Sequence, residues 1–436
     1  MRQLNVWMNG ERVGLWSVGR TGQHTFSYAD GWREHPKSRP LSLSLPLTAD
    51  GQLSGPAVEN YFDNLLPDNE LIRRRLSGRF KTRGVDPFSL LQAIGRDCVG
   101  AVQLLPVTAP APDVRRVDGD LLRTEQIEAM LAGLGSSVGL GAMDGDDDFR
   151  ISIAGAQEKT ALLKVGDQWY RPRDATPTTH ILKPPIGVTP GRNLDLTLSA
   201  ENEWLCARIL TSLGLPVADC HVERFGSSKA LVVKRFDRQW QRDPDWLVRM
   251  PQEDLCQVLG QASVNKYEDA GGPGMDACLR VLAGGTRYEA DGRIFLLAQL
   301  AFWLLAAIDG HAKNFSVFLL PGGRYHLTPL YDVMSAWPII GAGPNAIQYK
   351  KARLAMAVRS QSAHYKLSEI LPRHWKAVAA RSGIASMWEA MCTMVEEVPA
   401  ALGRVANELP HDFPPVLADT VFDGVRRHAQ AFMAQI

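Results

Sequence analysis

The sequence predicts an α+β protein in which a small mixed unit comes first, a strand-rich lobe follows and a helix-rich lobe ends the chain. A proline-rich stretch at 106–113 separates the first hundred residues from the rest. Short β-type runs fill much of residues 149–250, whereas helical patterns prevail after Pro251. A β-rich lobe followed by an α-rich lobe, with a cleft between them, is the simplest arrangement of that order. The chain of 436 residues allows about two to three domains.

The first expected domain covers residues 1–106. Within it, residues 41–47 alternate between leucine and other residues, which predicts a strand closed by a proline. Residues 62–76 follow a helical apolar rhythm and carry three consecutive arginines. We expect residues 107–148 to be a linker region.

The strand-rich lobe is expected over residues 149–250. Residues 196–213 have a helical pattern, with Ser199 as the expected N-cap. The runs that predict strands lie on both sides of this helix, at 150–153, 160–165, 169–170, 179–183 and 231–236.

The helix-rich lobe is expected over residues 251–436. Its most apolar segment, 294–308, would span about 22 Å as a helix, short of the roughly 30 Å of a bilayer's hydrocarbon core. We therefore expect a helix buried inside the domain and no membrane-spanning segment. Residues 315–319 and 324–328 are strand-like and flank a Pro-Gly-Gly turn, so they predict a hairpin.

The composition excludes several classes of protein. Forty-eight Lys and Arg against 47 Asp and Glu leave a formal charge of +1, which argues against a uniformly basic surface for nucleic acid or membranes. The hydrophobic fraction of 45% and charged fraction of 22% are typical of globular proteins. The six cysteines form no C-x-x-C pair, and the N-terminus has no apolar signal-peptide region. We therefore expect a cytoplasmic protein with reduced thiols.

The strongest chemical signal is the segment D-G-H-A-K-N at 309–314, directly after the apolar segment 294–308. Asp332 follows after the expected hairpin, which can return it to the neighbourhood of Asn314. The pattern suits phosphoryl transfer, because Asp309 can orient or deprotonate a hydroxyl while Asn314 and Asp332 hold Mg²⁺ through oxygen ligands. The structural alternative is a polar loop that caps a helix.

A second signal is the loop of small residues S-I-A-G-A-Q-E-K-T at 152–160. Small residues let backbone amides approach a phosphate, although an ordinary hairpin loop has a similar composition. Lys183 ends a later strand, and the next helix carries Glu201 and Glu203. A lysine steadied by a carboxylate can contact ATP phosphates, whereas a solvated strand end is the simpler reading. The loop, the lysine, a glutamate and the Asp–Asn–Asp set in this order are more specific than any one of them.

Two other hypotheses stay open. Asp309, His311 and Asp332 could bind a transition metal in a metal-dependent hydrolase. Such sites usually recruit further histidines, and the small-residue loop and Lys183 would then have no role. The other hypothesis is a catalytically idle binding subunit, which the intact set of candidate residues disfavours.

Six strings of residues, spread in order along the chain, resemble one known family. They are F-D-N-L-L-P-D at 62–68, I-G-R-D-C-V-G-A-V at 94–102, I-S-I-A-G-A-Q-E-K-T-A at 151–161, P-Q-E-D at 251–254, D-G-H-A-K-N-F-S-V-F at 309–318 and Y-D-V-M-S-A at 331–336. The sequence resembles the HipA family, the serine/threonine kinase toxins of bacterial HipBA toxin–antitoxin modules, nearly from end to end. Strings in this order are far more specific than a generic kinase motif.

The resemblance implies a bilobal, protein-kinase-like fold with an additional small N-terminal α/β domain. It also implies ATP and Mg²⁺ as cofactors, Asp309 as the catalytic residue, and Asn314 and Asp332 as metal ligands. The implied nucleotide-binding positions are Ala154, Gly155, Ala156, Gln157, Glu158 and Lys159 in a phosphate loop, Lys183 at the phosphates, Lys234, Arg235 and Phe236 in a hinge beside adenine, and His311, Lys313, Asn314, Tyr331 and Asp332 around the nucleotide.

Further details follow from the same resemblance. Ser152 is the implied autophosphorylation site, where a phosphate would repel ATP and inactivate the kinase. Lys234 departs from the acidic hinge residue of the best-known family member; a backbone contact to adenine survives this change, but a side-chain contact would differ. The N-E pair in the following helix favours Glu203 over Glu201 as the partner of Lys183, and the choice stays open.

The family also implies partners and a substrate. HipB, a small helix-turn-helix antitoxin dimer, binds operator DNA, and the complex represses its own operon. A near-neutral toxin fits this arrangement, because the antitoxin supplies most of the phosphate neutralisation. The implied substrate is an aminoacyl-tRNA synthetase, glutamyl-tRNA synthetase in a close relative. Its phosphorylation would stop translation and cause growth arrest and persistence.

Overall fold

The computed structural model describes residues 1–134, 157–189, 191–242 and 245–436. The chain forms two compact units, each assembled from three segments that are distant in sequence. Unit 1 consists of Met1–Pro184, Glu223–Val264 and Ser316–Tyr325; unit 2 consists of Pro185–Val222, Asn265–Phe315 and His326–Ile436.

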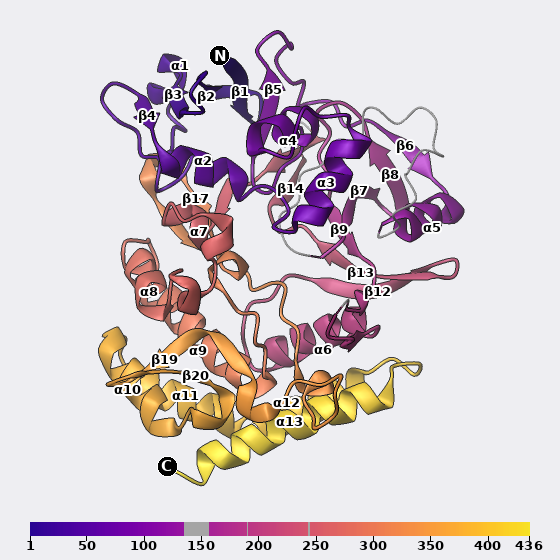
Figure 1. Cartoon of the computed structure of the whole chain (residues 1–436), viewed down its shortest axis with the longest axis vertical. Helices are drawn as coiled ribbons and strands as arrows, with labels where there is room; N and C mark the ends of the chain where they lie inside the picture. Colours follow the sequence, from indigo (N-terminus) through magenta and orange to yellow (C-terminus); the bar gives the residue numbers. More distant parts are fainter. Residues whose placement is uncertain (135–156, 190, 243–244) are drawn as a thin grey trace. The chain divides into compact units, whose positions relative to one another are not determined.

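Unit 1 begins with a five-stranded antiparallel sheet of order β4-β3-β2-β1-β5 (Figure 1). Its strands are β1 (Arg2–Met8), β2 (Glu11–Val18), β3 (His24–Tyr28), β4 (Gln52–Ser54) and β5 (Val102–Pro106), and its helices are α1 (Asp30–Arg33), α2 (Pro56–Asp63), α3 (Glu70–Arg79) and α4 (Pro87–Ile94). The Trp16 ring on β2 stacks on Phe62 of α2, with ring centroids 3.9 Å apart. This buried aromatic contact fixes α2 on one face of the sheet.

The prediction of a strand over residues 41–47 is wrong. This segment makes a turn, closed by a hydrogen bond of 2.9 Å from the Leu45 N–H to the Ser42 carbonyl. Leu45 is buried in the core, while the Ser42 and Ser44 hydroxyls donate to the Gln257 carbonyl at 3.3 and 2.7 Å. The residues alternate because the buried leucines pack in the core while the serines between them bond to Gln257. A turn with this arrangement shows the same two-residue period as a strand.

The single helix expected over residues 62–76 is two helices, α2 and α3, with Pro67 in the break between them. Proline removes a backbone donor and disfavours a helical conformation for the residue before it. Asn69 then starts α3, because its side chain accepts a hydrogen bond of 2.8 Å from the Leu71 N–H. The proline and the Asn69 cap therefore divide the segment into two helices, although its apolar spacing fits one continuous helix.

The second sheet of unit 1 has the strand order β12-β13-β9-β7-β8-β6 (Figure 1). The strands are β6 (Gly119–Leu122), β7 (Thr160–Val165), β8 (Gln168–Pro172), β9 (His180–Lys183), β12 (Cys220–Phe225) and β13 (Ser228–Lys234). The strands expected at 160–165, 169–170 and 179–183 are thus confirmed, and the one expected at 150–153 lies outside the described residues. The expected linker region holds β6 and the helix α5 (Thr124–Gly133), which packs on β13.

Shorter elements complete unit 1. They are β14 (Arg238–Arg242) paired with β15 (Asp245–Arg249), β16 (Gln252–Asp254) paired with β17 (Ser316–Leu319), and the helix α7 (Leu255–Val258). The hairpin expected over residues 315–328 is confirmed, because β17 and β18 (Tyr325–Leu327) flank the Pro321–Gly323 turn and are neighbours in one sheet. The sequence did not predict β16.

Unit 2 is mainly helical. Its helices are α6 (Ser199–Ser212), α8 (Met275–Ala283), α9 (Tyr288–Leu305), α10 (Pro372–Ser382), α11 (Met387–Glu396), α12 (Val398–Glu408) and α13 (Pro415–Met433), and its strand pairs are β10 (Gly187–Val188) with β11 (Asp195–Leu196) and β19 (Arg353–Arg359) with β20 (Ala363–Lys366). The apolar helix α9 contacts α6, α8, α10, α11 and α13, so it lies at the centre of the unit (Figure 1). This confirms the helix expected to be buried, and no helix in the described ranges is long and apolar enough to cross a membrane.

Ser199 does not cap α6 as expected. Leu198 holds the N-cap position, and Ser199 is the first helical residue. The Ser199 hydroxyl instead accepts a hydrogen bond of 2.9 Å from the Ile186 N–H. The side chain therefore holds the preceding loop rather than the helix's own backbone.

Candidate active site

The end of helix α9 delivers the candidate catalytic segment. Ala306 takes a left-handed conformation with φ 51°, and the Ala307 N–H donates to the Phe302 carbonyl at 2.7 Å, so the helix stops there. Gly310 then passes close to the Phe302 ring: a Cβ on Gly310 would lie 2.4 Å from the Phe302 Cδ2 atom. Only glycine fits this approach, and the chain turns tightly against the core helix.

Asp309, His311 and Asn314 lie in one hydrogen-bonded turn. The His311 N–H donates to the Asp309 carbonyl at 2.8 Å, and the Asn314 N–H donates to the His311 carbonyl at 2.9 Å. The Asn314 side-chain amide also donates to the Asp309 carbonyl at 2.8 Å, which leaves its side-chain oxygen to accept from other groups or to bind a cation. The turn therefore fixes the aspartate and the asparagine relative to each other.

The Asp309 carboxylate is accessible to solvent, unlike the other polar side chains of this turn named above. Its side chain is 62% exposed, whereas His311 and Asn314 are buried. One carboxylate oxygen accepts a hydrogen bond of 2.5 Å from the Tyr267 hydroxyl and lies 3.8 Å from the His311 Nε2 atom. An accessible carboxylate held on one oxygen can accept a proton or a hydrogen bond from an incoming hydroxyl.

A second segment brings Asp332 towards the same turn. The hydroxyl of the preceding residue, Tyr331, donates to the Lys313 carbonyl at 2.9 Å. Asp332 has a left-handed backbone with φ 60°, which is unusual for a residue other than glycine or asparagine. Such strained conformations are retained where the surrounding structure determines them, often at functional sites. Tyr331 therefore contacts the turn that carries Asp309, His311, Lys313 and Asn314, and Asp332 follows Tyr331 directly in the chain; all six residues belong to unit 2.

Asn202 on α6 holds the segment after Asp332, a role that the sequence did not predict. Its side-chain amide donates to the Ser335 carbonyl at 2.8 Å and its oxygen accepts from the Ser335 N–H at 2.9 Å. The Ser335 hydroxyl in turn donates to the carbonyl of Leu305, the last residue of α9, at 2.6 Å. All three residues are buried, and the three hydrogen bonds tie α6, α9 and the segment after Asp332 to one another.

The remaining candidate residues lie in unit 1. Lys183 ends β9, is buried, and pairs with Leu231 of β13. The Gln157 side chain donates to the carbonyl of Pro184, next to Lys183, at 2.9 Å. The structure therefore brings this candidate phosphate-loop residue to the end of β9. Neighbouring Glu158 pairs with Arg75 of α3, and Ser152, Ala154, Gly155 and Ala156 lie outside the described residues.

The expected hinge residues differ in what their side chains do. Lys234 is exposed and pairs with His180 at the end of the β13–β9 ladder, and Phe236 is partly buried. Arg235 is buried, and its N–H donates to the Thr179 carbonyl at 2.8 Å. The guanidinium of Arg235 is committed to protein groups, so this side chain is not directed to a nucleotide.

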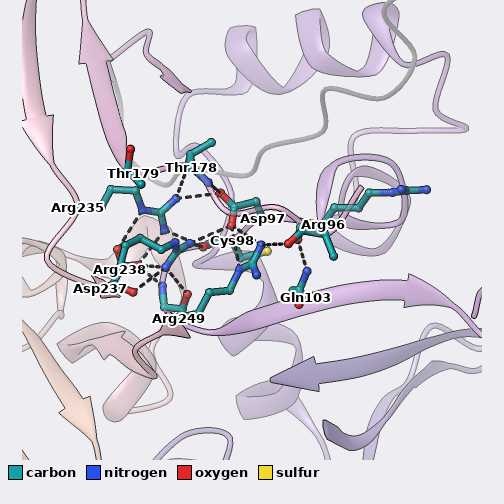
Figure 2. Close-up of polar contacts among 12 residues, drawn as sticks. Arg96, Asp97, Cys98, Gln103, Thr178, Thr179, Arg235, Asp237, Arg238 and Arg249 are labelled. Carbon is teal, nitrogen blue, oxygen red and sulfur yellow. Dashed lines mark hydrogen bonds and ion pairs between the residues drawn. The ribbon is translucent and has the colours of Figure 1, made fainter. Parts of the chain in front are cut away.

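Arg235 belongs to a buried polar network that Figure 2 shows. We call it the Asp97 network; its charged members are Asp97, Asp237, Arg235, Arg238 and Arg249. All five are at most 8% exposed. Asp97 accepts hydrogen bonds from all three arginines and from both the N–H and the hydroxyl of Thr178.

The network gives its members unusual proton affinities. Burial alone raises the pKa of Asp97, but Arg238, Arg235 and Arg249 together hold that pKa well below its usual range. For Arg249 burial prevails and lowers the pKa to about 10, although Asp97 opposes it. Burial also raises the pKa of the neighbouring Cys98 thiol to about 12, which disfavours the thiolate form. No sequence pattern predicted that Asp97 contacts arginines some 140 residues away.

Across the described part of the chain, no group of three or more His, Cys, Asp or Glu side chains is placed to hold a metal ion. The candidate metal ligands Asn314 and Asp332 provide an amide oxygen and a carboxylate, which are the hard donors that Mg²⁺ prefers. Magnesium commonly binds through one or two protein oxygens and completes its coordination with water and phosphate. The donor set therefore fits Mg²⁺ brought with a nucleotide.

Comparison with known proteins shows family similarity over most of the chain. A family model described as the HipA-like C-terminal domain matches residues 151–405, and one described as the HipA N-terminal domain matches residues 4–105. The putative kinase Y4mE of Sinorhizobium fredii is 31% identical over 421 residues, which are 94% of this chain and 93% of that protein. The serine/threonine-protein kinase toxin HipA of Shewanella oneidensis is 29% identical over 319 residues, 71% of this chain and 69% of that protein.

Among solved structures, a chain in the Shewanella oneidensis complex of HipA, HipB and operator DNA has a similar fold. The TM-score is 0.81 at 23% sequence identity, over 99% of this chain and 97% of that chain. The predicted α+β, protein-kinase-like fold is therefore confirmed.

Proposed function

This chain belongs to the HipA family of serine/threonine-protein kinase toxins, and from that premise we propose that it transfers the γ-phosphoryl group of ATP to a serine or threonine hydroxyl, with Asp309 as the catalytic residue. It is a protein kinase, as its named relatives are. The observation that carries the assignment is the turn in which an accessible Asp309 is fixed to the buried Asn314.

In this mechanism Asp309 accepts a hydrogen bond from the acceptor hydroxyl and takes its proton as the transfer proceeds. A bond forms between the acceptor oxygen and the γ-phosphorus, the bond from that phosphorus to the β–γ bridging oxygen breaks, and ADP leaves. The accessibility of the Asp309 carboxylate supports this role, because a substrate hydroxyl must reach it. His311, on the same turn, adds polar character beside the carboxylate.

Asn314 and Asp332 would hold Mg²⁺, which neutralises charge on the ATP phosphates when it is bound. Lys183 at the end of β9 would contact the phosphates, together with the loop of residues 154–159. The Gln157 contact at the carbonyl after Lys183 supports a common location for loop and lysine. Since the Arg235 side chain and N–H bond to protein groups, the adenine would meet the main chain at Lys234 or Phe236.

We also propose that the acceptor is an aminoacyl-tRNA synthetase, with glutamyl-tRNA synthetase as the first candidate, and that its phosphorylation arrests growth and causes persistence. The Shewanella oneidensis relative was solved with HipB and operator DNA. By analogy, a HipB-like helix-turn-helix antitoxin dimer would bind this chain, and the complex would repress its operon mainly through the antitoxin's DNA contacts. Ser152 would be the site of inactivating autophosphorylation.

The test is phosphate transfer from labelled ATP to purified glutamyl-tRNA synthetase, with growth followed on expression in cells. The wild-type chain should label the synthetase and arrest growth, and co-expression of the antitoxin should relieve the arrest. Asp309→Asn should abolish both effects. Asp423→Asn, which changes an exposed carboxylate on α13, is the matched control and should behave like wild type. Wild-type labelling by Asp309→Asn would overturn the assignment of Asp309.

A further inference from the structure

We propose that Tyr267 is a positioning residue for catalysis: its hydroxyl fixes one oxygen of Asp309, so that the carboxylate presents its other oxygen to the acceptor hydroxyl. This inference rests on the proposed function, because it gives Tyr267 a role only through Asp309. Tyr267 lies in K-Y-E-D-A-G-G-P-G, residues 266–274, which the sequence analysis assigned to no function.

Tyr267 contacts the candidate catalytic turn directly, through its hydroxyl and through its ring. The Tyr267 hydroxyl donates to the Asp309 carboxylate at 2.5 Å. The Tyr267 ring packs edge to face against the His311 ring, with centroids 5.1 Å apart and an interplanar angle of 85°. His311 belongs to the same turn as Asp309, so the tyrosine contacts the candidate catalytic turn through both its ring and its hydroxyl.

The segment that carries Tyr267, residues 265–274, folds tightly on itself; we call it the Tyr267 strap. The Gly272 N–H donates to the Tyr267 carbonyl at 2.9 Å. A Cβ on Gly272 would lie 2.0 Å from the Asn265 carbonyl oxygen, and one on Gly274 would lie 2.3 Å from the Glu268 carboxyl carbon. These distances exclude any other residue without movement of the strap. The two glycines therefore permit the tight fold of the strap, and Gly272 bonds directly to the backbone of Tyr267.

Acidic side chains anchor the Tyr267 strap to strand β19 of the same unit. The Glu268 side chain is only 7% exposed. It accepts hydrogen bonds from the Ala357 N–H at 2.6 Å and from the Arg359 guanidinium at 2.9 Å. The bond to Glu268 raises the pKa of Arg359. Asp269 adds an exposed ion pair with Arg353 at 3.4 Å. The strap is thus held at both its own turn and the neighbouring strand, as a positioning device requires.

The chemical consequence follows from the symmetry of a carboxylate. Its two oxygens are equivalent, and an exposed aspartate can rotate about its terminal torsion. A phenol that donates to one oxygen removes this freedom and leaves the second oxygen in a defined direction. Because the side chain is 62% exposed, the second oxygen has room for an acceptor. Pre-organised positioning of this kind increases the rate of the chemical step and not the affinity for ATP.

Tyr267→Phe in the full chain is the central test. We measure kcat and the KM for ATP with glutamyl-tRNA synthetase as the acceptor, together with the Tm. The variant should lose about 10-fold in kcat, a part of what a positioned general base contributes, with an unchanged KM for ATP and an unchanged Tm. Tyr288→Phe is the matched control, because it removes a hydroxyl that donates to the Ser382 carbonyl at 2.5 Å. That control should keep the wild-type kcat.

Gly272→Ala provides the second arm, since it should displace the strap. By itself it should lower kcat to the level of Tyr267→Phe, and in the Tyr267→Phe background it should lower kcat no further. An additional loss in the double variant would overturn the role of Tyr267. So would a Tyr267→Phe variant with wild-type or higher kcat, the latter identifying the tyrosine as a competitor of the acceptor hydroxyl. If the wild-type chain transfers no phosphate, the proposed function fails and the role of Tyr267 fails with it.

Discussion

The substitution Asp97→Asn tests whether the N-terminal part of the chain supports the candidate nucleotide-binding strands. Three guanidinium and two carboxylate groups give the Asp97 network a formal charge of +1, and the substitution raises it to +2 without changing the shape of the side chain. Asp97 bonds to Thr178, just before β9, and to Arg235, just after β13. Asp97 therefore holds together the segment before β9 and the segment after β13 (Figure 2). Lys183 ends β9, and the expected hinge follows β13.

The expected loss of stability is large. Removing one partner of a fully buried ion pair costs about 3–5 kcal/mol, because the other charge stays buried without compensation. For units of this size that corresponds to a decrease in Tm of roughly 10 °C. We also expect a higher KM for ATP, since the end of the β9–β13 pair loses its support. Thr178→Val is the milder variant: it removes only the hydroxyl that donates to Asp97 at 2.7 Å, worth about 1 kcal/mol.

Thermal and urea unfolding measure these changes, with Asp30→Asn as the matched control. Asp30 forms an exposed ion pair with Arg33, and its side chain is 89% exposed, so its loss should change little. The dependence on pH gives a second readout. A lowered pKa means that Asp97 contributes stability above the usual aspartate range and loses it as the pH falls, so the wild type should lose more stability below about pH 4 than Asp97→Asn does. An Asp97→Asn protein within about 1 kcal/mol of the wild type would refute the reasoning.

Three further substitutions test other parts of the structure. Burial raises the pKa of Glu253 to about 8, so the folded state retains a proton that the unfolded state releases. The wild type should therefore lose up to about 4 kcal/mol of stability as the pH rises from 5 to 8. Glu253→Gln should remove that decline, as measured by urea unfolding at several pH values. Gly310→Ala should displace the Phe302 ring or the candidate catalytic turn and cost about 1–3 kcal/mol with loss of kinase activity; an active, equally stable variant would show that the close approach is not required. Asn202→Ala leaves the buried Ser335 backbone groups without their partners and should cost about 1–3 kcal/mol in thermal unfolding; a wild-type Tm would contradict this role.

Several strands and the core helix could be predicted from sequence because their signals are local. The strands β7, β8 and β9 follow short apolar runs between turn residues, and α9 follows from a segment too apolar to lie anywhere but in a core. The same local patterns predicted the wrong structure at residues 41–47. Alternating leucines there anchor a turn, whose serines bond to a segment about 215 residues away. No pattern within seven residues contains that information.

Some residues of the candidate site could likewise be predicted from local sequence, and others could not. The D-G-H-A-K-N segment identified Asp309 and Asn314 as candidates because several polar side chains within one short turn are a local signal. Asn202, Tyr267 and Asp97 carried no comparable signal, since each acts through a partner that is distant in sequence. A glycine pattern after Tyr267 was the one local trace of the strap, and its meaning depends on carbonyls that the fold places 2.0 to 2.7 Å from a Cβ.

The sequence by itself determined the family and the types of residue that are candidates for the chemistry, because these depend on short motifs and on their order along the chain. Tertiary structure alone decided which side chains support them. The charges of the Asp97 network are tolerable in the interior because Asp97 pairs there with arginines that lie about 140 to 150 residues away in the sequence. Likewise the Asp309 carboxylate is oriented only because a strap anchored on β19 brings a phenol to it. Such long-range compensation lies in the fold and not in any local pattern.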